Sequence, residues 1–217
     1  MSASYIDKII CPECGREGTF TYWSTINTMQ EKVMRKMVRT GSAFMYTCPE
    51  CGKTTIVDYP FIYHQMEDQM MIYYAKEDKV DEAEKYFAKQ EETFEELKVG
   101  GEVYLNRIVT SLDEFLEKLK IFDADMDDRI IEIVKIIYAQ LIMQQNPEAK
   151  FDNIFFTYGP EGQKLLSFMV DGAAALSIEL SADVYESIEN QYAGKIPALR
   201  HSEPLVNREW AINFLSN

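Results

Sequence analysis

The pattern of hydrophobic and polar positions is clearest in the second half of the chain. Residues 103–110 predict a strand, and the S-x-x-E sequence from Ser111 to Glu114 has the form of a capping box, which predicts a helix to about residue 122. A longer helix is predicted over residues 126–145, where the apolar residues at helical spacing are Ile130, Ile133, Val134, Ile137 and Leu141. Further isoleucines widen that stripe. We therefore expect this helix to be buried on two sides or to form a subunit contact.

The remainder of the second half predicts a hairpin, a further strand and two helices. Residues 151–158 and 163–170 are joined by the turn sequence GPEG and predict a β-hairpin, and AALSIEL at 174–180 predicts another strand. Ser181 begins a predicted helix that reaches Tyr192. A short helix is predicted near the C-terminal end, and its apolar residues are Val206, Trp210 and Phe214.

The first half predicts shorter elements. Residues 18–23, 43–47 and 54–57 are rich in strand-forming residues. Between the first two lies TMQEKVMRKMVRTG, which predicts an amphipathic helix with Met29, Val33 and Met37 as its apolar stripe and Gly41 as its stop. Residues 70–75 predict a strand and residues 78–97 a highly charged helix. The pair Gly100-Gly101 then marks a predicted boundary.

These elements mix without regular βαβ alternation, so the expected fold class is α+β. We expect three parts along the chain: a zinc-ribbon-like unit at 1–66, a helical connector at 67–100 and a C-terminal α+β domain at 101–217.

The distribution of charge changes the picture of function. Residues 1–60 hold seven Lys/Arg and six Asp/Glu, whereas residues 61–217 hold 15 and 30, so the net charge of −14 comes from the second part. An acidic body disfavours electrostatic capture of nucleic acid or of an anionic membrane. The sequence shows neither a secretory signal pattern nor a stretch of about 18 consecutive apolar residues, so we expect a cytoplasmic protein without membrane association.

The sequence CPECG occurs twice, at residues 11–15 and 48–52, and these copies contain all four cysteines in the spacing C-x2-C-x33-C-x2-C. In each copy the chain reverses between two cysteines, so that both sulfurs turn towards one point, and the glycine suits the turn because it accepts positive φ. Two facing copies make a tetrahedron of four thiolates, which predicts one structural zinc ion with the ligands Cys11, Cys14, Cys48 and Cys51. Such a closed site has no open position for a catalytic water.

Other readings of the cysteines remain. Iron fits the same four thiolates, as in rubredoxin-like electron carriers, and the aromatic residues that would pack around it are Tyr22, Trp23, Phe44 and Tyr46. A thioredoxin-like redox pair would have one C-x-x-C beside a βαβ pattern, which this sequence lacks. Two disulfides are disfavoured in the cytoplasm. Zinc is favoured because it accepts four thiolates and undergoes no redox change.

Three further groups of residues are candidates for a site. The insert helix carries a basic face that could touch nucleic acid or could simply be solvated, formed by Lys32, Arg35, Lys36 and Arg39. DADMDD at 123–128 resembles the start of a calcium loop, but the required glycine and glutamate are replaced by Asp128 and Val134, so a turn between helices is expected. The two histidines, His64 and His201, show no partner pattern, and we find no catalytic constellation.

Segments around the cysteines resemble one bacterial family. ICPECG, YWSTIN, FMYTCPECGK and VDYPFIYH are similar to the CpXC domain, which is named for its paired CPxC motifs. RIVTSLDEFLEKLKIFDADMDDRIIEIVK is similar to the segment that often follows it, so the resemblance covers mainly residues 10–66 and 104–135. The four cysteines map onto the family's motif cysteines, and Asp127-Asp128-Arg129 resembles its acidic–basic turn. Gln65, after His64, departs from the acidic residue expected there. The resemblance implies the metal site and the architecture, and supplies no substrate.

We therefore expect a metal-stabilised binding or adaptor protein that is not an enzyme and that binds a protein partner. A homodimer through the broad face of the 126–145 helix is a further expectation. The alternatives are a rubredoxin-like iron electron carrier and, ranked below it because of the acidic body, a nucleic-acid-binding zinc ribbon.

Overall fold

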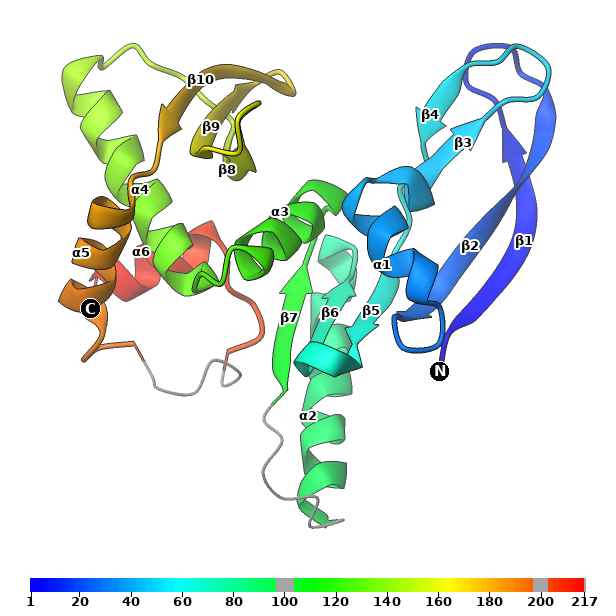
Figure 1. Cartoon of the computed structure of the whole chain (residues 1–217), viewed down its shortest axis with the longest axis horizontal. Helices are drawn as coiled ribbons and strands as arrows, with labels where there is room; N and C mark the ends of the chain where they lie inside the picture. Colours follow the sequence, from blue (N-terminus) through cyan, green and yellow to red (C-terminus); the bar gives the residue numbers. More distant parts are fainter. Residues whose placement is uncertain (97–103, 197–202, 217) are drawn as a thin grey trace. The chain divides into compact units, whose positions relative to one another are not determined.

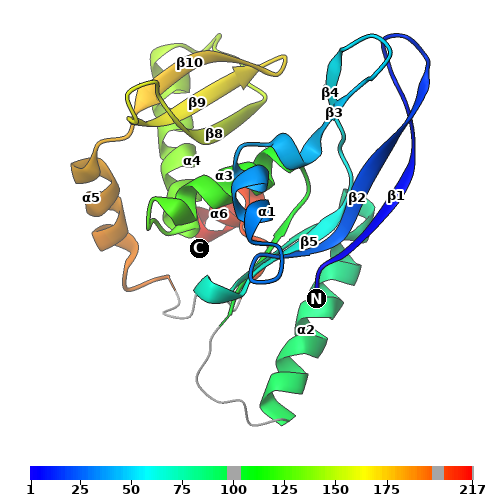
Figure 2. The same ribbon diagram turned by 45° about the vertical axis from the view of Figure 1, so that its right-hand side comes forward.

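The computed structural model describes residues 1–96, 104–196 and 203–216 and confirms the α+β class (Figures 1 and 2). The chain forms two compact units, Met1–Leu116 and Glu117–Asn217, with the boundary inside helix α3 (Leu112–Asp123). The two units are defined by the contacts within each of them. The division into three parts at residues 66 and 100 stays a prediction. The predicted boundary at Gly100-Gly101 and the residue His201 lie outside the described residues.

The first unit is built on a five-stranded sheet in the order β1-β2-β5-β6-β7. Its strands are β1 (Ala3–Ile10), β2 (Glu17–Asn27), β5 (Phe61–Gln65), β6 (Met70–Tyr74) and β7 (Leu105–Val109). The β1–β2 and β5–β6 pairs are antiparallel, while β2–β5 and β6–β7 are parallel. The stretch predicted as a helical connector therefore supplies an interior strand, β6, as well as helix α2 (Val80–Glu96).

The crossover between β2 and β5 contains helix α1 (Lys32–Arg39), the short 3-10 turn η1 (Ser42–Phe44) and the hairpin of β3 (Met45–Thr47) and β4 (Thr54–Ile56). Two more 3-10 turns, η2 (Met66–Asp68) and η3 (Glu77–Lys79), precede β6 and α2. Gly41 stops α1 as predicted, and its φ of 73° lies in the left-handed region that glycine adopts without strain.

The predicted apolar stripe of α1 is wrong. Met34 and Val38 are the residues that the helix buries, at 3% and 0% exposed, whereas Met29 and Val33 are 55% and 61% exposed. The helix begins at Lys32, later than the pattern assumed, so Met29 lies outside it. This short helix has two pairs of apolar residues at i, i+4 spacing, Val33 with Met37 and Met34 with Val38. The second pair is the one that the fold buries.

Aromatic side chains form the core of the first unit. The ring of Phe61 lies 4.8 Å from that of Phe115, 5.1 Å from that of Phe44 and 5.7 Å from that of Tyr74, measured between centroids. All four residues are at most 2% exposed. Aromatic pairs in stacked or edge-to-face contact add to the free energy gained from burial. Here Phe44 stacks on Phe61 and joins the inserted segment to the sheet, while the edge-to-face contact of Phe115 joins the start of α3 to it.

The second unit combines a three-stranded antiparallel sheet with helices. The sheet has the order β10-β9-β8, and its strands are β8 (Asn153–Tyr158), β9 (Lys164–Val170) and β10 (Ala173–Glu179). The helices are the end of α3, α4 (Asp128–Gln145), α5 (Ala182–Tyr192) and α6 (Arg208–Ser216). The hairpin, the further strand and the helices predicted for this region are confirmed, except that Val206 lies before α6 and not in it.

Helix α4 is the centre of that unit. Ile130, Ile133 and Val134 are buried, and so are Ile131 and Ile136 on the sides of the stripe. The prediction for Leu141 is wrong, because this residue of the last turns is 46% exposed. The helix contacts α5, α6 and β8, so burial on two sides accounts for the breadth of its apolar face. A subunit contact stays a prediction. Among the helices of the described residues, none has the length and apolar character needed to cross a membrane.

Candidate metal centre

The two CPECG copies are the tips of two hairpins. The first lies between β1 and β2, and the second lies between β3 and β4. Both views show these hairpins side by side, with their tips at the same end (Figures 1 and 2). The fold therefore brings together two segments that are far apart in the sequence.

The two tips have the same backbone hydrogen bonds. In the first, the N–H of Cys11 donates to the carbonyl five residues later, and the N–H of Gly15 donates to the carbonyl of Cys11, both at 2.9 Å. The same two bonds, also 2.9 Å, recur at Cys48 and Gly52. Gly15 and Gly52 have φ values of 69° and 71°, which an L-residue with a side chain adopts only with strain. The repeated sequence thus produces a repeated knuckle.

The four sulfur atoms converge. All lie within 4.8 Å of one another, and the Cys11–Cys51 and Cys14–Cys48 sulfur pairs are both 3.7 Å apart. Sulfurs placed at about 2.3 Å from a central zinc ion at tetrahedral angles lie about 3.8 Å from each other, so the geometry fits a four-thiolate metal site. A disulfide requires about 2.05 Å, and all four cysteines are free thiols.

The electrostatics of the cluster also fit a cation. Backbone N–H groups of Cys51 and Glu50 favour the thiolate of Cys48 and lower its pKa to about 6. The backbone N–H of Arg16 acts in the same direction on Cys14, but burial and the three neighbouring sulfurs prevail and raise its pKa to about 12. Four thiolates at these distances repel each other, and a bound cation removes that repulsion.

Tyr46 on β3 lies against this cluster. Its hydroxyl is buried and makes no hydrogen bond of normal geometry to any described residue. Burial raises the pKa of Tyr46, and the neighbouring Cys48 sulfur raises it further. A metal-bound thiolate accepts hydrogen bonds, so this orphaned hydroxyl is a second observation that fits a metal. Gly18 makes room for it, because a side chain at that position would overlap the Tyr46 hydroxyl.

A model of the CpXC protein family matches residues 9–135, more than half of the chain. The chain belongs to the CpXC family. The match spans both knuckles and ends inside α4, which confirms the resemblance that the sequence indicates. Comparisons with curated proteins and with solved structures gave no match.

In this CpXC chain, half of the basic face on α1 is used internally. Arg35 forms ion pairs with Glu67 at 3.2 Å and Asp68 at 3.0 Å. Arg39 donates to the Tyr63 hydroxyl at 2.9 Å and to the Gln65 side-chain oxygen at 3.0 Å. These bonds tie the insert to β5 and η2, so the two arginines serve the fold of the unit. Lys32 and Lys36 are exposed.

The remaining candidate residues make contacts of their own within each unit. His64 faces the Tyr104 hydroxyl at 3.2 Å, and burial lowers the pKa of its imidazole. Asp127 caps α4 by accepting from the Arg129 N–H at 2.9 Å, and the side chains of these two residues pair at 2.7 Å. DADMDD is therefore the turn between α3 and α4, as its sequence predicts.

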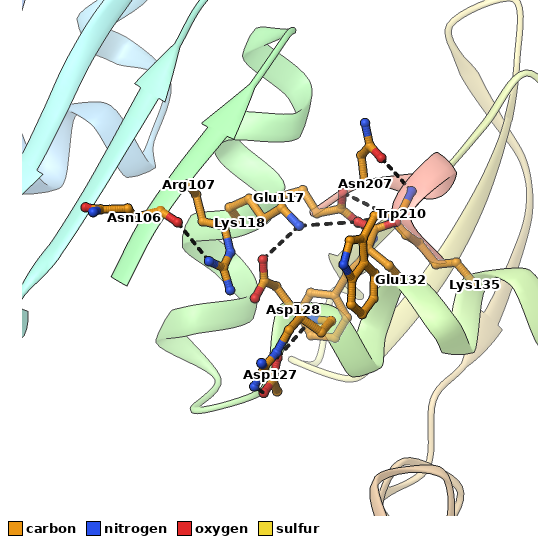
Figure 3. Close-up of polar contacts among 12 residues, drawn as sticks. Asn106, Arg107, Glu117, Lys118, Asp127, Asp128, Glu132, Lys135, Asn207 and Trp210 are labelled. Carbon is orange, nitrogen blue, oxygen red and sulfur yellow. Dashed lines mark hydrogen bonds and ion pairs between the residues drawn. The ribbon is translucent and has the colours of Figure 1, made fainter. Parts of the chain in front are cut away.

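The sequence did not reveal a buried network of charges in the second unit (Figure 3). Lys135 on α4 pairs with Glu117 at 3.1 Å and Glu132 at 2.8 Å, and Lys118 pairs with Asp128 at 3.0 Å. All five side chains are at most 9% exposed. A signal was present: α4 is apolar on nearly all sides, so a charge in its first half has no solvent to face.

Proposed function

We propose that Cys11, Cys14, Cys48 and Cys51 hold one structural zinc ion in a zinc-ribbon-like unit, and that this unit serves as a binding module for a protein partner in the cytoplasm. The observation that carries the proposal is the convergence of the four sulfurs, with 3.7 Å between the atoms of two pairs.

A structural role is supported by what surrounds the sulfurs. Four protein ligands leave no coordination position for a water or a substrate. The strand that leads into the first knuckle contributes little to a hydrophobic core, because every residue of β1 except Ile9 is exposed. In small metal domains, binding of the ion supplies free energy of folding that the core does not.

A binding role is supported by the way the unit is built. The site is closed, so the ion fixes two hairpins in position and takes no part in chemistry. Electrostatic capture of nucleic acid is disfavoured, since the chain has a net charge of −14 and two of the four basic residues of α1 are engaged within the unit. What the hairpins present is surface for another protein.

The experiment is elemental analysis of the untagged full chain, purified without chelators, together with its visible spectrum. We expect one zinc ion per chain and no colour. If iron is found instead, with thiolate-to-iron absorption that bleaches on reduction, the protein is a rubredoxin-like electron carrier and the proposal of a structural zinc site is wrong. Absence of any metal, with the cysteines oxidised, would overturn the proposal.

A further inference from the structure

Strand β2 has an open edge beside the knuckles. It pairs with β1 along nearly all its length, but with β5 only over residues 25–27, so within the described residues no strand borders the other side of its first part. In an antiparallel pair, successive residues direct their main-chain groups alternately towards the partner strand and away from it. The bond from the Cys11 N–H to the carbonyl of residue 16 shows which residues of β2 face β1. By that alternation, the main-chain groups of Thr19 and Thr21 point away from β1. The N–H of Trp23 agrees, because it donates on that side to the Tyr59 hydroxyl at 3.4 Å.

Strand β3 has an open edge as well. The N–H of Cys48 donates to the carbonyl of Lys53, and the N–H of Val57 donates to the carbonyl of Phe44, both across the β3–β4 ladder. Between these two bonds, successive residues of β3 direct their main-chain groups alternately towards β4 and away from it. The main-chain N–H and C=O of Thr47 and the C=O of Met45 therefore face away from β4. Within the described residues, no strand pairs with that edge.

Both open edges border one cleft of about 450 Å³. It is lined by Thr19, Phe20, Thr21, Trp23, Met34, Met37, Ser42, Ala43, Met45, Tyr46, Thr47 and Pro49. None of these residues carries a charge, although the chain as a whole has a net charge of −14. The strands and α1 that form the walls are visible in Figure 1.

We propose that this cleft binds an extended peptide segment of the partner, which adds as a strand along the open edge of β2. The inference rests on the proposed binding role and names its partner chemistry. Strand addition satisfies free main-chain groups that a compact ligand leaves unmatched. The edges of Thr19, Thr21 and Thr47 offer donors and acceptors in the alternating spacing of a strand.

The walls determine which peptide fits. The peptide side chains that point into the cleft must be uncharged, because the lining offers no charged partner and a buried charge without a partner is costly. Met34, Met37 and Met45 contribute flexible thioether side chains, which adapt to apolar groups of different shapes. The ligand class is therefore an extended segment with uncharged β-forming residues, recognised mainly through its backbone.

The test is selection of a displayed library of random heptapeptides on the zinc-loaded full chain, followed by affinity measurement on two matched variants. Thr21→Pro removes a main-chain N–H from the open edge of β2 without removing a bond to β1. Ile6→Pro is the control: Ile6 is the direct partner of Thr21 in the ladder, and its N–H points to the outer edge of the same hairpin. We expect selected peptides to lose about tenfold in affinity on Thr21→Pro, as for one or two hydrogen bonds, and to bind Ile6→Pro unchanged.

A third variant, Met37→Glu, keeps the backbone and places a carboxylate in the cleft wall, and we expect it to lose binding too. The inference is overturned if no peptide is enriched over the Met37→Glu protein, if Thr21→Pro binds equally well, or if only Ile6→Pro loses binding. A dimer of the chain that Thr21→Pro dissociates would also overturn it, because the strand would then come from a second copy. Zinc content measured on the same preparations separates these failures from failure of the proposed metal centre.

Discussion

The two units hold their structure by different means. The hairpins of the first unit end in knuckles of repeated geometry, and their outer strand β1 is exposed on almost every residue. The second unit surrounds α4 with a continuous apolar core and encloses five charged side chains in one network. In the proposed picture, stability of the first arrangement depends on one ion, whereas stability of the second is divided among many contacts. We therefore expect a substitution to destabilise only the unit in which it lies, and the loss of stability to differ greatly between the two units.

The largest effect is expected from Cys48→Ser. With three thiolates the site no longer holds its ion, and structural zinc in small domains contributes about 10–16 kcal/mol of apparent binding free energy. We expect loss of metal by elemental analysis and loss of hydrogen-exchange protection in the β1–β2 and β3–β4 hairpins, with the second unit unchanged. Thr47→Ser, on the same hairpin, keeps all four sulfurs and is the control. A metal-free Cys48→Ser protein that keeps both hairpins protected would contradict the comparison.

The second largest effect is expected from Lys135→Met in the other unit. Removal of the ammonium group leaves the Glu117 and Glu132 carboxylates buried without that partner, which costs about 3–5 kcal/mol. The measurement is urea unfolding followed by Trp210 fluorescence in a Trp23→Phe background, with Lys150→Met as the exposed control. Zinc content should stay the same. A loss no greater than that of the control would show that the network contributes little.

A smaller effect is expected from Gly18→Ala. The added methyl group overlaps the Tyr46 hydroxyl, and overpacking of this kind costs about 1–3 kcal/mol. Hydrogen exchange in the β3–β4 hairpin is the measurement, and Gly194→Ala, with open space around the new atom, is the control. Repeating the change in a Tyr46→Phe background should recover part of the loss. An equal loss in both backgrounds would assign the effect to the backbone of β2.

The smallest effect is expected from Ser181→Ala. Ser181 caps α5 by accepting from the Val184 N–H, and loss of such a cap costs about 1 kcal/mol. The urea midpoint of the second unit should fall slightly, without change in metal content. Ser187→Ala, exposed on the same helix, should have no effect. Equal midpoints for the two variants would show that this cap is not used.

Much of the architecture follows from local pattern. The GPEG hairpin, the capping box at Ser111 and the first half of the α4 stripe each combine a periodicity with a turn or cap residue, and these were predicted correctly. Two facing CPECG copies also predict the convergence of the sulfurs, because identical turns place their cysteines in the same way. The chemistry of the candidate site could thus be predicted before its geometry.

Other features could not be found in this way. Strand β1 was missed because Tyr5, Ile6 and Ile10 are exposed, so its apolar residues do not mark a buried face. The apolar character of α4 indicates that a charge in its first half is buried, but the pairing of Lys135 with Glu117 of α3 depends on tertiary packing that no pattern within one helix contains. The open edges of β2 and β3 depend on which strands fail to pair, which a pattern within one segment does not reveal.

An ion bound between Cys14 and Cys48 would turn residues 15–47 into a closed ring of chain. The entropy of closing such a ring grows only with the logarithm of its length, so doubling the ring would cost about 0.6 kcal/mol. The turn at Met29 and Gln30 is exposed and precedes α1. A reporter peptide or small domain with adjacent termini could be spliced in there, and the knuckles would still meet.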